Sequence, residues 1–238
     1  MAGSGTRGRP ASRLARGLAG LLLVVAAGLG ACRMEAPERG EASRRAAETG
    51  FRGRVIDDPG PRPDFVLRDA RGGTFDFRAE TEGRLALLFF GYTHCPDVCP
   101  IHMSSIAEVK RDLGLRFGRR TRVIFVTVDP ARDTPERIVS WLESFDAEFI
   151  GLYGEPARID SIQLALGLPP AMVPEPTRPD GATDGAADGA AATYDVGHAS
   201  AVVAFPPGDS IRVMFPHGTR QEDWRHDLEA LAALGGTE

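Results

Sequence analysis

The stretch Leu85 to Pro100 reads LALLFFGYTHCPDVCP, and the rest of the chain is best understood from it. Its first six residues, Leu85 to Phe90, form a continuous apolar run of the length expected for a strand buried on both faces. Cys95 and Cys99 follow after a short turn, and a helix-like segment begins at Pro100. Two thiols between a strand and a helix indicate either a redox pair or part of a soft-metal site.

Elements on both sides of this stretch define the fold class. Alternation of apolar residues around a glycine pair predicts a β-hairpin over residues 65–77. Further strands are predicted over 122–128, 149–153, 202–205 and 211–215, and helices over 101–113, 133–145, 155–166 and 221–234. Strands that alternate with helices predict an α/β sandwich around a mixed central sheet. A dithiol at the first strand-to-helix junction of such a sheet is the arrangement of thioredoxin.

The N-terminal residues indicate export. Residues 1–31 contain four arginines and no acidic residue, followed by an apolar run that is too short for a comfortable membrane span. The run ends in Leu29-Gly30-Ala31-Cys32, which resembles the lipobox of bacterial lipoproteins, in which the cysteine is lipidated. We therefore predict a lipoprotein-type signal peptide over 1–31, with an uncleaved anchor as the alternative. The mature protein is expected to be membrane-anchored on the periplasmic or extracytoplasmic side.

The remainder divides into a tether and one domain. Residues 32–60 are polar, lack apolar periodicity and predict a flexible membrane tether, while 61–238 form the predicted domain, with its ordered part starting near Pro63. Residues 169–193, rich in Pro, Gly, Ala and Asp, predict a flexible loop within it. Removal of four arginines from the 28 Lys and Arg leaves 24 against 33 Asp and Glu, a net charge of −9. Such an acidic body argues against a nucleic-acid partner.

The spacing of the two cysteines bears on their chemistry. Pro100 favours a helix that starts at its own position, which would place Cys99 at the N-cap and stabilise its thiolate. Three residues between the cysteines, rather than the two of thioredoxin, allow both sulfurs to face one external atom, although a Cys95–Cys99 disulfide remains feasible. If Cys32 carries lipid, these two are the remaining thiols.

Two thiolates alone leave a metal under-coordinated, and an imidazole would complete a copper site. Five histidines are available. His94 is expected to point away from its neighbour Cys95, and His102 to lie exposed on a helix. His198 stands directly before an apolar strand, where it could lie beside the Cys turn. The others are His217, in a turn, and His226, on the polar face of the last helix.

Three segments together make a family recognisable. They are Gly91-Tyr92-Thr93-His94-Cys95-Pro96-Asp97-Val98-Cys99-Pro100, Thr127-Val128-Asp129-Pro130-Ala131-Arg132-Asp133-Thr134-Pro135 and Tyr194-Asp195-Val196-Gly197-His198-Ala199-Ser200. In this order they resemble the Sco/SenC family, over about residues 63–234. The resemblance implies a thioredoxin-like domain that binds one copper ion, Cu(I) or Cu(II), through Cys95, Cys99 and His198.

The resemblance also implies a function. Family members serve assembly of the dinuclear copper centre of cytochrome c oxidase, so the expected partner is the copper-site subunit of that enzyme, with a thioredoxin-like reductant or a periplasmic copper donor as further candidates. A thiol-disulfide oxidoreductase that keeps the oxidase cysteines reduced is the alternative, and a peroxidase using Arg132 is a third. Asp97 and Asp129 are candidates for a supporting role beside the metal, with a simple turn-forming role as the alternative for Asp129.

Overall fold

A computed structural model of the chain describes residues 1–3, 49–56, 59–173 and 194–234. The predicted lipidation site Cys32, nearly all of the predicted signal segment and residues 174–193 of the predicted loop lie outside this part. Among the described residues, no helix combines the length and the apolar character needed to cross a bilayer.

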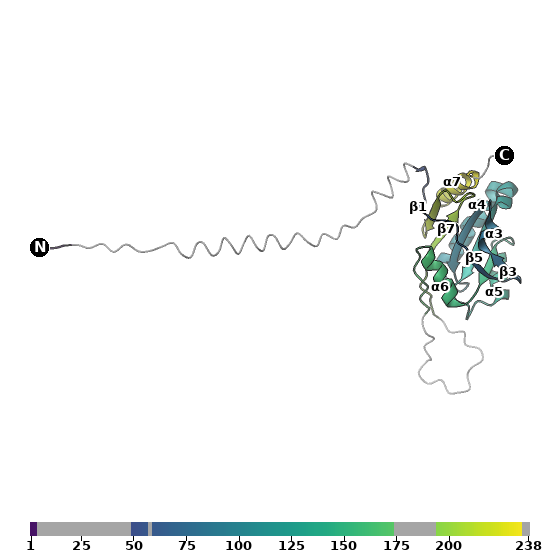
Figure 1. The fold of residues 1–238 in the computed structure, drawn as a ribbon, viewed down its shortest axis with the longest axis horizontal. Helices are drawn as coiled ribbons and strands as arrows, with labels where there is room; N and C mark the ends of the chain where they lie inside the picture. Colours follow the sequence, from purple (N-terminus) through teal and green to yellow (C-terminus); the bar gives the residue numbers. More distant parts are fainter. Residues whose placement is uncertain (4–48, 57–58, 174–193, 235–238) are drawn as a thin grey trace, which may run out of the picture. The chain divides into compact units, whose positions relative to one another are not determined.

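One mixed sheet of eight strands organises the domain (Figure 1). In spatial order the strands are β1 (Arg54–Ile56), β8 (Arg212–Pro216), β7 (Ala201–Phe205), β4 (Leu85–Gly91), β5 (Thr121–Thr127), β6 (Ile150–Tyr153), β2 (Val66–Asp69) and β3 (Thr74–Asp76). β4, β5 and β6 run parallel, and the other neighbouring pairs are antiparallel. The predicted α/β thioredoxin-like class, with its mixed sheet and its hairpin of β2 and β3, is therefore confirmed.

The helices lie on both faces of the sheet. They are α3 (Phe77–Thr81), α4 (Val98–Arg120), α5 (Pro135–Glu143), α6 (Pro156–Ala165) and α7 (Gln221–Ala233). The crossovers β4–α4–β5 and β5–α5–β6 move along the sheet in the same direction. Because connections between parallel strands are right-handed, α4 and α5 lie on the same face. Trp224 of α7 stacks on Phe215 of β8 on that face, whereas Phe77 of α3 packs against Phe205 on the other.

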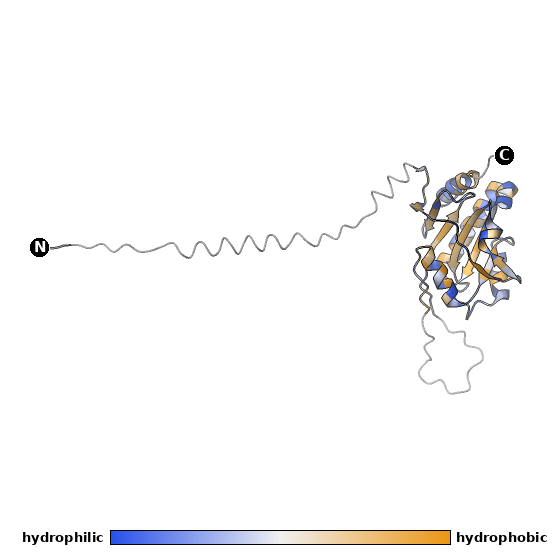
Figure 2. Cartoon of the chain, in the orientation of Figure 1, coloured by the Kyte–Doolittle hydropathy of each residue, from blue (hydrophilic) through white to orange (hydrophobic). Residues whose placement is uncertain are grey.

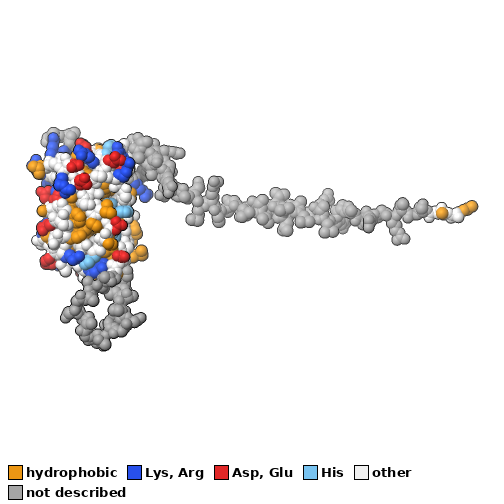
Figure 3. Space-filling model, turned by 180° about the vertical axis from the view of Figure 1, so that it is seen from behind, with side chains coloured by type: hydrophobic (Ala, Val, Ile, Leu, Met, Phe, Trp, Pro, Cys, Tyr) orange, Lys and Arg blue, Asp and Glu red, His pale blue; other side chains and the backbone are white. Residues whose placement is uncertain are grey.

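The core follows from the central strands. All seven residues of β4 are buried, as are six of the seven of β5, because helices or loops cover both faces of these strands. The hydropathy colouring shows the apolar residues concentrated in the sheet and the polar ones on the outer sides of the helices (Figure 2). Acidic and basic side chains are interspersed on the face shown in Figure 3.

Two segments are more ordered than the sequence predicts. Residues 54–56, placed in the tether, form β1 and pair with β8, and the buried carboxylate of Asp227 accepts hydrogen bonds from the backbone N–H groups of Arg52 and Gly53. The ordered domain thus begins before Pro63. At the start of the predicted flexible loop, Met172 forms an antiparallel bridge with Gly197 through two backbone hydrogen bonds of 2.7 and 3.1 Å. Both cases depend on backbone pairing with distant segments, which local composition does not reveal.

Candidate metal centre

The candidate site lies at the carboxyl ends of the parallel strands. β4 ends at Gly91 and leads into the Cys turn, whereas β7 runs antiparallel to β4 and therefore starts at this same end of the sheet. Phe89 is paired with Val202, so the register continued by two residues places Gly91 opposite Ser200. The segment that precedes β7 consequently lies beside the Cys turn, although almost a hundred residues separate the two in the sequence.

The Cys turn is closed by local hydrogen bonds. The N–H of Cys95 donates to the carbonyl of Tyr92 at 3.2 Å, and the N–H of Ile101 donates to the carbonyl of Asp97. α4 therefore begins at Val98, with Asp97 as its N-cap residue, and Cys99 lies inside the first turn. The prediction that the helix starts at Pro100 with Cys99 as its cap was wrong, because a proline is also accommodated at the third helical position, where no intrahelical donor is required.

A glycine makes room for the second sulfur. A Cβ atom built on Gly91 would lie 2.8 Å from the Sγ of Cys99 and 2.8 Å from the ring of Phe89. The sulfur of Cys99, which is fully buried, therefore packs directly against the backbone at the end of β4. Any larger residue at position 91 would displace it.

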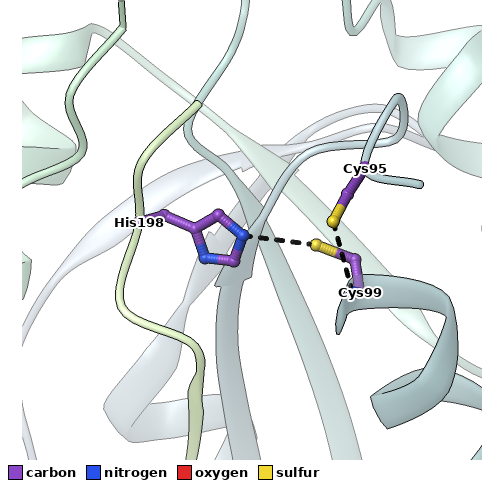
Figure 4. Close-up of side chains that lie close together, drawn as sticks. All are labelled: Cys95, Cys99 and His198. Carbon is purple, nitrogen blue, oxygen red and sulfur yellow. Dashed lines mark hydrogen bonds between the residues drawn. The ribbon is translucent and has the colours of Figure 1, made fainter. Parts of the chain in front are cut away.

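Three donor atoms converge at this point (Figure 4). The Nε2 of His198 lies 3.5 Å from the Sγ of Cys99, and the Sγ of Cys95 lies 3.5 Å from the backbone nitrogen of Cys99. The donor atoms of Cys95, Cys99 and His198 all lie within 4.8 Å of one another. Within the described residues, no other three His, Cys, Asp or Glu side chains are grouped in this way.

The imidazole of His198 is oriented for coordination. Its Nδ1 lies 3.2 Å from the carbonyl oxygen of Ala199, and a carbonyl only accepts, so Nδ1 carries the proton. Nε2 then presents its lone pair toward the sulfurs. The edge contacts of the ring with Tyr92 and Phe89, at 5.6 and 5.9 Å between ring centroids, hold it in this direction.

The two thiols share one proton unequally. The pKa of Cys95 is lowered, chiefly because the Cys99 thiol donates a hydrogen bond to its sulfur, with smaller contributions from backbone N–H groups, against the opposing effect of burial. The pKa of Cys99 is raised, because its proton is held by Cys95 and because the thiol is buried. These directions favour the thiolate at Cys95 rather than at Cys99, the reverse of the expectation from the helix dipole.

Asp133 supports the Cys turn through hydrogen bonds, a role that its sequence context does not predict. Its buried carboxylate accepts hydrogen bonds from the N–H of Thr93 at 2.9 Å, from the hydroxyl of Thr93 at 2.6 Å and from the hydroxyl of Thr127 at 2.6 Å. The sequence pattern had suggested Asp133 as part of a helix start, but Thr134 caps α5 instead. Asp133 therefore ties the end of β5 to the residues just before Cys95.

Asp129 fixes the segment that carries His198. Its buried carboxylate accepts a hydrogen bond from the Tyr194 hydroxyl at 2.8 Å and pairs with the guanidinium of Arg132. That guanidinium lies 3.5 Å above the ring of Tyr194 and donates to the Tyr194 carbonyl at 3.0 Å. Asp129 therefore does more than form a turn, which was the alternative role considered for it: it also holds Tyr194 and Arg132. Arg132 is engaged with Tyr194, which gives no support to the peroxidase hypothesis.

The other sequence candidates lie elsewhere. The side chain of Asp97 is exposed and makes no capping hydrogen bond to α4, and its supporting role stays a prediction. The Nδ1 of His94 faces Asp133 at 3.4 Å, as its expected orientation away from Cys95 implies. His102 is buried rather than exposed, at 1% of its accessible surface. His217 lies in a turn and His226 on the last helix, as predicted, and both are exposed.

The family model that matches this chain is SCO1/SenC, over residues 57–233. The chain belongs to the SCO1/SenC family. Among curated members, a Stutzerimonas stutzeri protein provisionally named as copper-binding is 35% identical over 137 residues, which cover 57% of this chain and 60% of that protein. The matched region thus spans less than two thirds of that relative.

Solved structures extend the comparison across the domain. ScoI of Bradyrhizobium japonicum, solved with copper bound, is 31% identical, with a TM-score of 0.57 and coverage of 72% of this chain and 99% of that one. BsSco, described as having a disulfide switch and as a member of the Sco family of cytochrome c oxidase assembly proteins, shares the fold at 17% identity and a TM-score of 0.50, over 75% of this chain and 98% of that one. A copper-bound neighbour and a Cys-Cys-His group in this SCO1/SenC chain together support copper binding.

Proposed function

We propose that this protein binds one copper ion through Cys95, Cys99 and His198 and delivers it to the dinuclear copper centre of cytochrome c oxidase during assembly of that enzyme. The observation that carries the proposal is the convergence of two sulfurs and one imidazole nitrogen within 4.8 Å. Thiolates are preferred ligands of Cu(I), and an added imidazole also suits Cu(II). Ligands at about 2.0–2.3 Å from one metal ion lie close enough together to match this grouping.

The chain's own residues would hold and release the ion. Cys95 is partly exposed and Cys99 is buried, so copper would enter and leave from the side of Cys95. His198 stands on a segment held by the hydrogen bonds of Tyr194 to Asp129 and of Gly197 to Met172, so contacts that involve no metal help to position the imidazole. When bound, copper supplies a transferable soft ion, and the copper-site subunit of the oxidase is the proposed acceptor.

Substitution of the histidine tests this assignment. Loss of a residue that only hydrogen-bonds to a metal ligand lowers metal affinity by about 10- to 100-fold. His198→Ala removes a ligand itself, so it should weaken Cu(II) binding by more than this and should change the sulfur-to-copper absorption. His226→Ala, which removes an exposed imidazole from α7, is the matched control and should bind as the wild type does. Equal affinity and an unchanged spectrum in His198→Ala would refute the ligand set.

A second function is favoured by the protonation of the two thiols. A partly exposed thiolate at Cys95 beside a buried, protonated Cys99 is the arrangement of an attacking and a resolving thiol. Cys95 would attack a disulfide of the oxidase subunit, Cys99 would displace the reduced subunit thiol, and the resulting Cys95–Cys99 disulfide would be reduced again by an external dithiol such as a thioredoxin-like protein. His198 would then be dispensable.

Complementation separates the two functions. In cells that lack the gene, we expect Cys95→Ser and His198→Ala both to fail to restore oxidase assembly without added copper. If His198→Ala restores assembly without added copper while Cys95→Ser does not, the reductase function holds and copper delivery does not.

We also propose that the protein is exported and held at the membrane by a lipid on Cys32, with a periplasmic copper donor supplying the ion. Support comes from the basic and apolar N-terminal residues and the lipobox-like Leu29-Gly30-Ala31-Cys32. Fatty-acid labelling of the wild type, and its loss in Cys32→Ala, is the expected result. Equal labelling of both proteins would contradict the lipid anchor.

A further inference from the structure

His102 occupies an unusual position for a helical histidine that ligates nothing. It lies in α4, three residues after Cys99, and only 1% of its surface is accessible. Aromatic rings surround it edge-on: Phe89 of β4 at 5.1 Å, Trp224 of α7 at 5.9 Å and His217 at 6.2 Å between centroids. A phenylalanine or leucine would fill such a site without the cost of burying an imidazole, so its polar atoms call for an explanation.

The polar contact of His102 points toward the third proposed ligand. Its Nε2 lies 3.2 Å from the carbonyl oxygen of Ser200. Because a carbonyl only accepts, Nε2 carries the proton, and burial lowers the pKa of His102 to about 4, which keeps the ring neutral at physiological pH. The imidazole therefore acts as a fixed donor to the backbone two residues after His198.

The Ser200 carbonyl is held from two directions. The backbone N–H of His217, directly after β8, donates to the same oxygen at 3.0 Å. One donor thus comes from the helix that carries Cys99 and the other from the neighbouring strand. The ring of Phe89 contacts both His102 and His198, at 5.1 and 5.9 Å between ring centroids, so it packs against both imidazoles.

We infer that His102 is a positioning residue, which sets the distance between the His198 imidazole and the Cys99 sulfur through the Ser200 carbonyl. α4 carries both His102 and Cys99, and Ser200 continues directly from His198, so one hydrogen bond joins the elements that bear two of the three proposed ligands. The inference rests on the proposed copper site, and it adds a residue outside the ligand set that controls the geometry of that set.

The test compares a variant that keeps the ring's shape with one that keeps its donor. His102→Phe fills the aromatic surroundings without a donor, and His102→Gln keeps an N–H donor at similar reach. His217→Ala is the matched control, because it removes the neighbouring exposed ring but keeps the backbone N–H that binds Ser200. Thermal unfolding establishes that each variant is folded, and His102→Leu replaces His102→Phe if the latter is not.

We expect His102→Phe to keep one Cu(II) per chain with an affinity lower by about 10-fold or more, and with altered Cu(II) hyperfine and charge-transfer spectra. His102→Gln should restore most of the affinity, and His217→Ala should match the wild type. In the copper-free protein, the imidazole ¹⁵N shifts of His198 should move in His102→Phe and return in His102→Gln.

The outcomes separate this inference from the copper proposal. Wild-type affinity, spectra and His198 shifts in folded His102→Phe would overturn it, as would equal behaviour of the Gln and Phe variants. Failure of the wild type itself to bind copper would instead refute the proposed function, while the His198 shifts in the copper-free protein would still report whether His102 positions that ring.

Discussion

Replacement of Asp133 should loosen both the fold and the Cys turn, because its carboxylate joins two segments. Asp133→Ala removes three hydrogen bonds to a charged acceptor and leaves the buried N–H of Thr93 without this partner. Each such bond is worth about 1.5–3 kcal/mol, so we expect a loss of at least about 4 kcal/mol in the free energy of unfolding. For a domain of this size, that corresponds to a fall of roughly 8–16 °C in the midpoint of thermal unfolding.

Asp133→Asn provides a graded comparison. Its amide oxygen can still accept, and its NH₂ group can donate to the hydroxyl of Thr93, so the expected loss is only about 1–2 kcal/mol, chiefly from the lost charge. Because Thr93 lies two residues before Cys95, this folded variant should also bind copper more weakly than the wild type.

Urea unfolding followed by circular dichroism measures the effect, with Asp64→Ala as control. The side chain of Asp64 is 71% exposed and faces Arg78 at 3.7 Å, so its removal should change stability by less than about 0.5 kcal/mol. A loss below about 1 kcal/mol in Asp133→Ala, or one equal to that of Asp64→Ala, would refute the role assigned to Asp133.

Three further predictions follow from single contacts. Gly91→Ala places a Cβ 2.8 Å from the Sγ of Cys99, so it should lower the free energy of unfolding in urea by about 1–3 kcal/mol and weaken copper binding. Wild-type stability and affinity in this variant would show that the sulfur can move aside. The lowered pKa of Cys95 means that its alkylation by iodoacetamide should remain fast as the pH falls to 6, and a rate that falls as for a free thiol, with its pKa of about 8.5, would contradict this. Asp227→Asn should speed hydrogen exchange in β1, because Asp227 holds the N–H of Gly53 at 2.7 Å, and unchanged exchange there would exclude that anchoring role.

Local sequence patterns predicted the elements and their class well. The apolar run Leu85 to Phe90 identifies β4, because a strand buried on both faces is apolar throughout. The alternation around Gly72-Gly73 identifies the β2–β3 hairpin, because a strand buried on one face alternates apolar and polar residues. β1 was missed because its three residues are held by β8 and Asp227, which lie far along the chain. α3 was missed because its five residues are too few to show a helical period.

Within the site, the residues that hold the ligand-bearing segments in place were harder to predict than the donors. The motif resemblance gave Cys95, Cys99 and His198, whose donor atoms the structure brings together. His102 lies three residues after Cys99, a spacing that places both on one face of a helix, and this signal could have indicated its burial. The role of Asp133 had no such signal, because Thr134 and Pro135 explain the helix start without it.

X-ray absorption at the copper edge of the copper-loaded protein tests the proposed ligand set most directly. We predict two sulfur atoms at about 2.3 Å, as for metal-bound thiolates, and the outer-shell scattering of one imidazole, which should disappear in His198→Ala. A spectrum of the wild type with sulfur ligands alone, or imidazole scattering that persists in His198→Ala, would contradict the three-residue copper site.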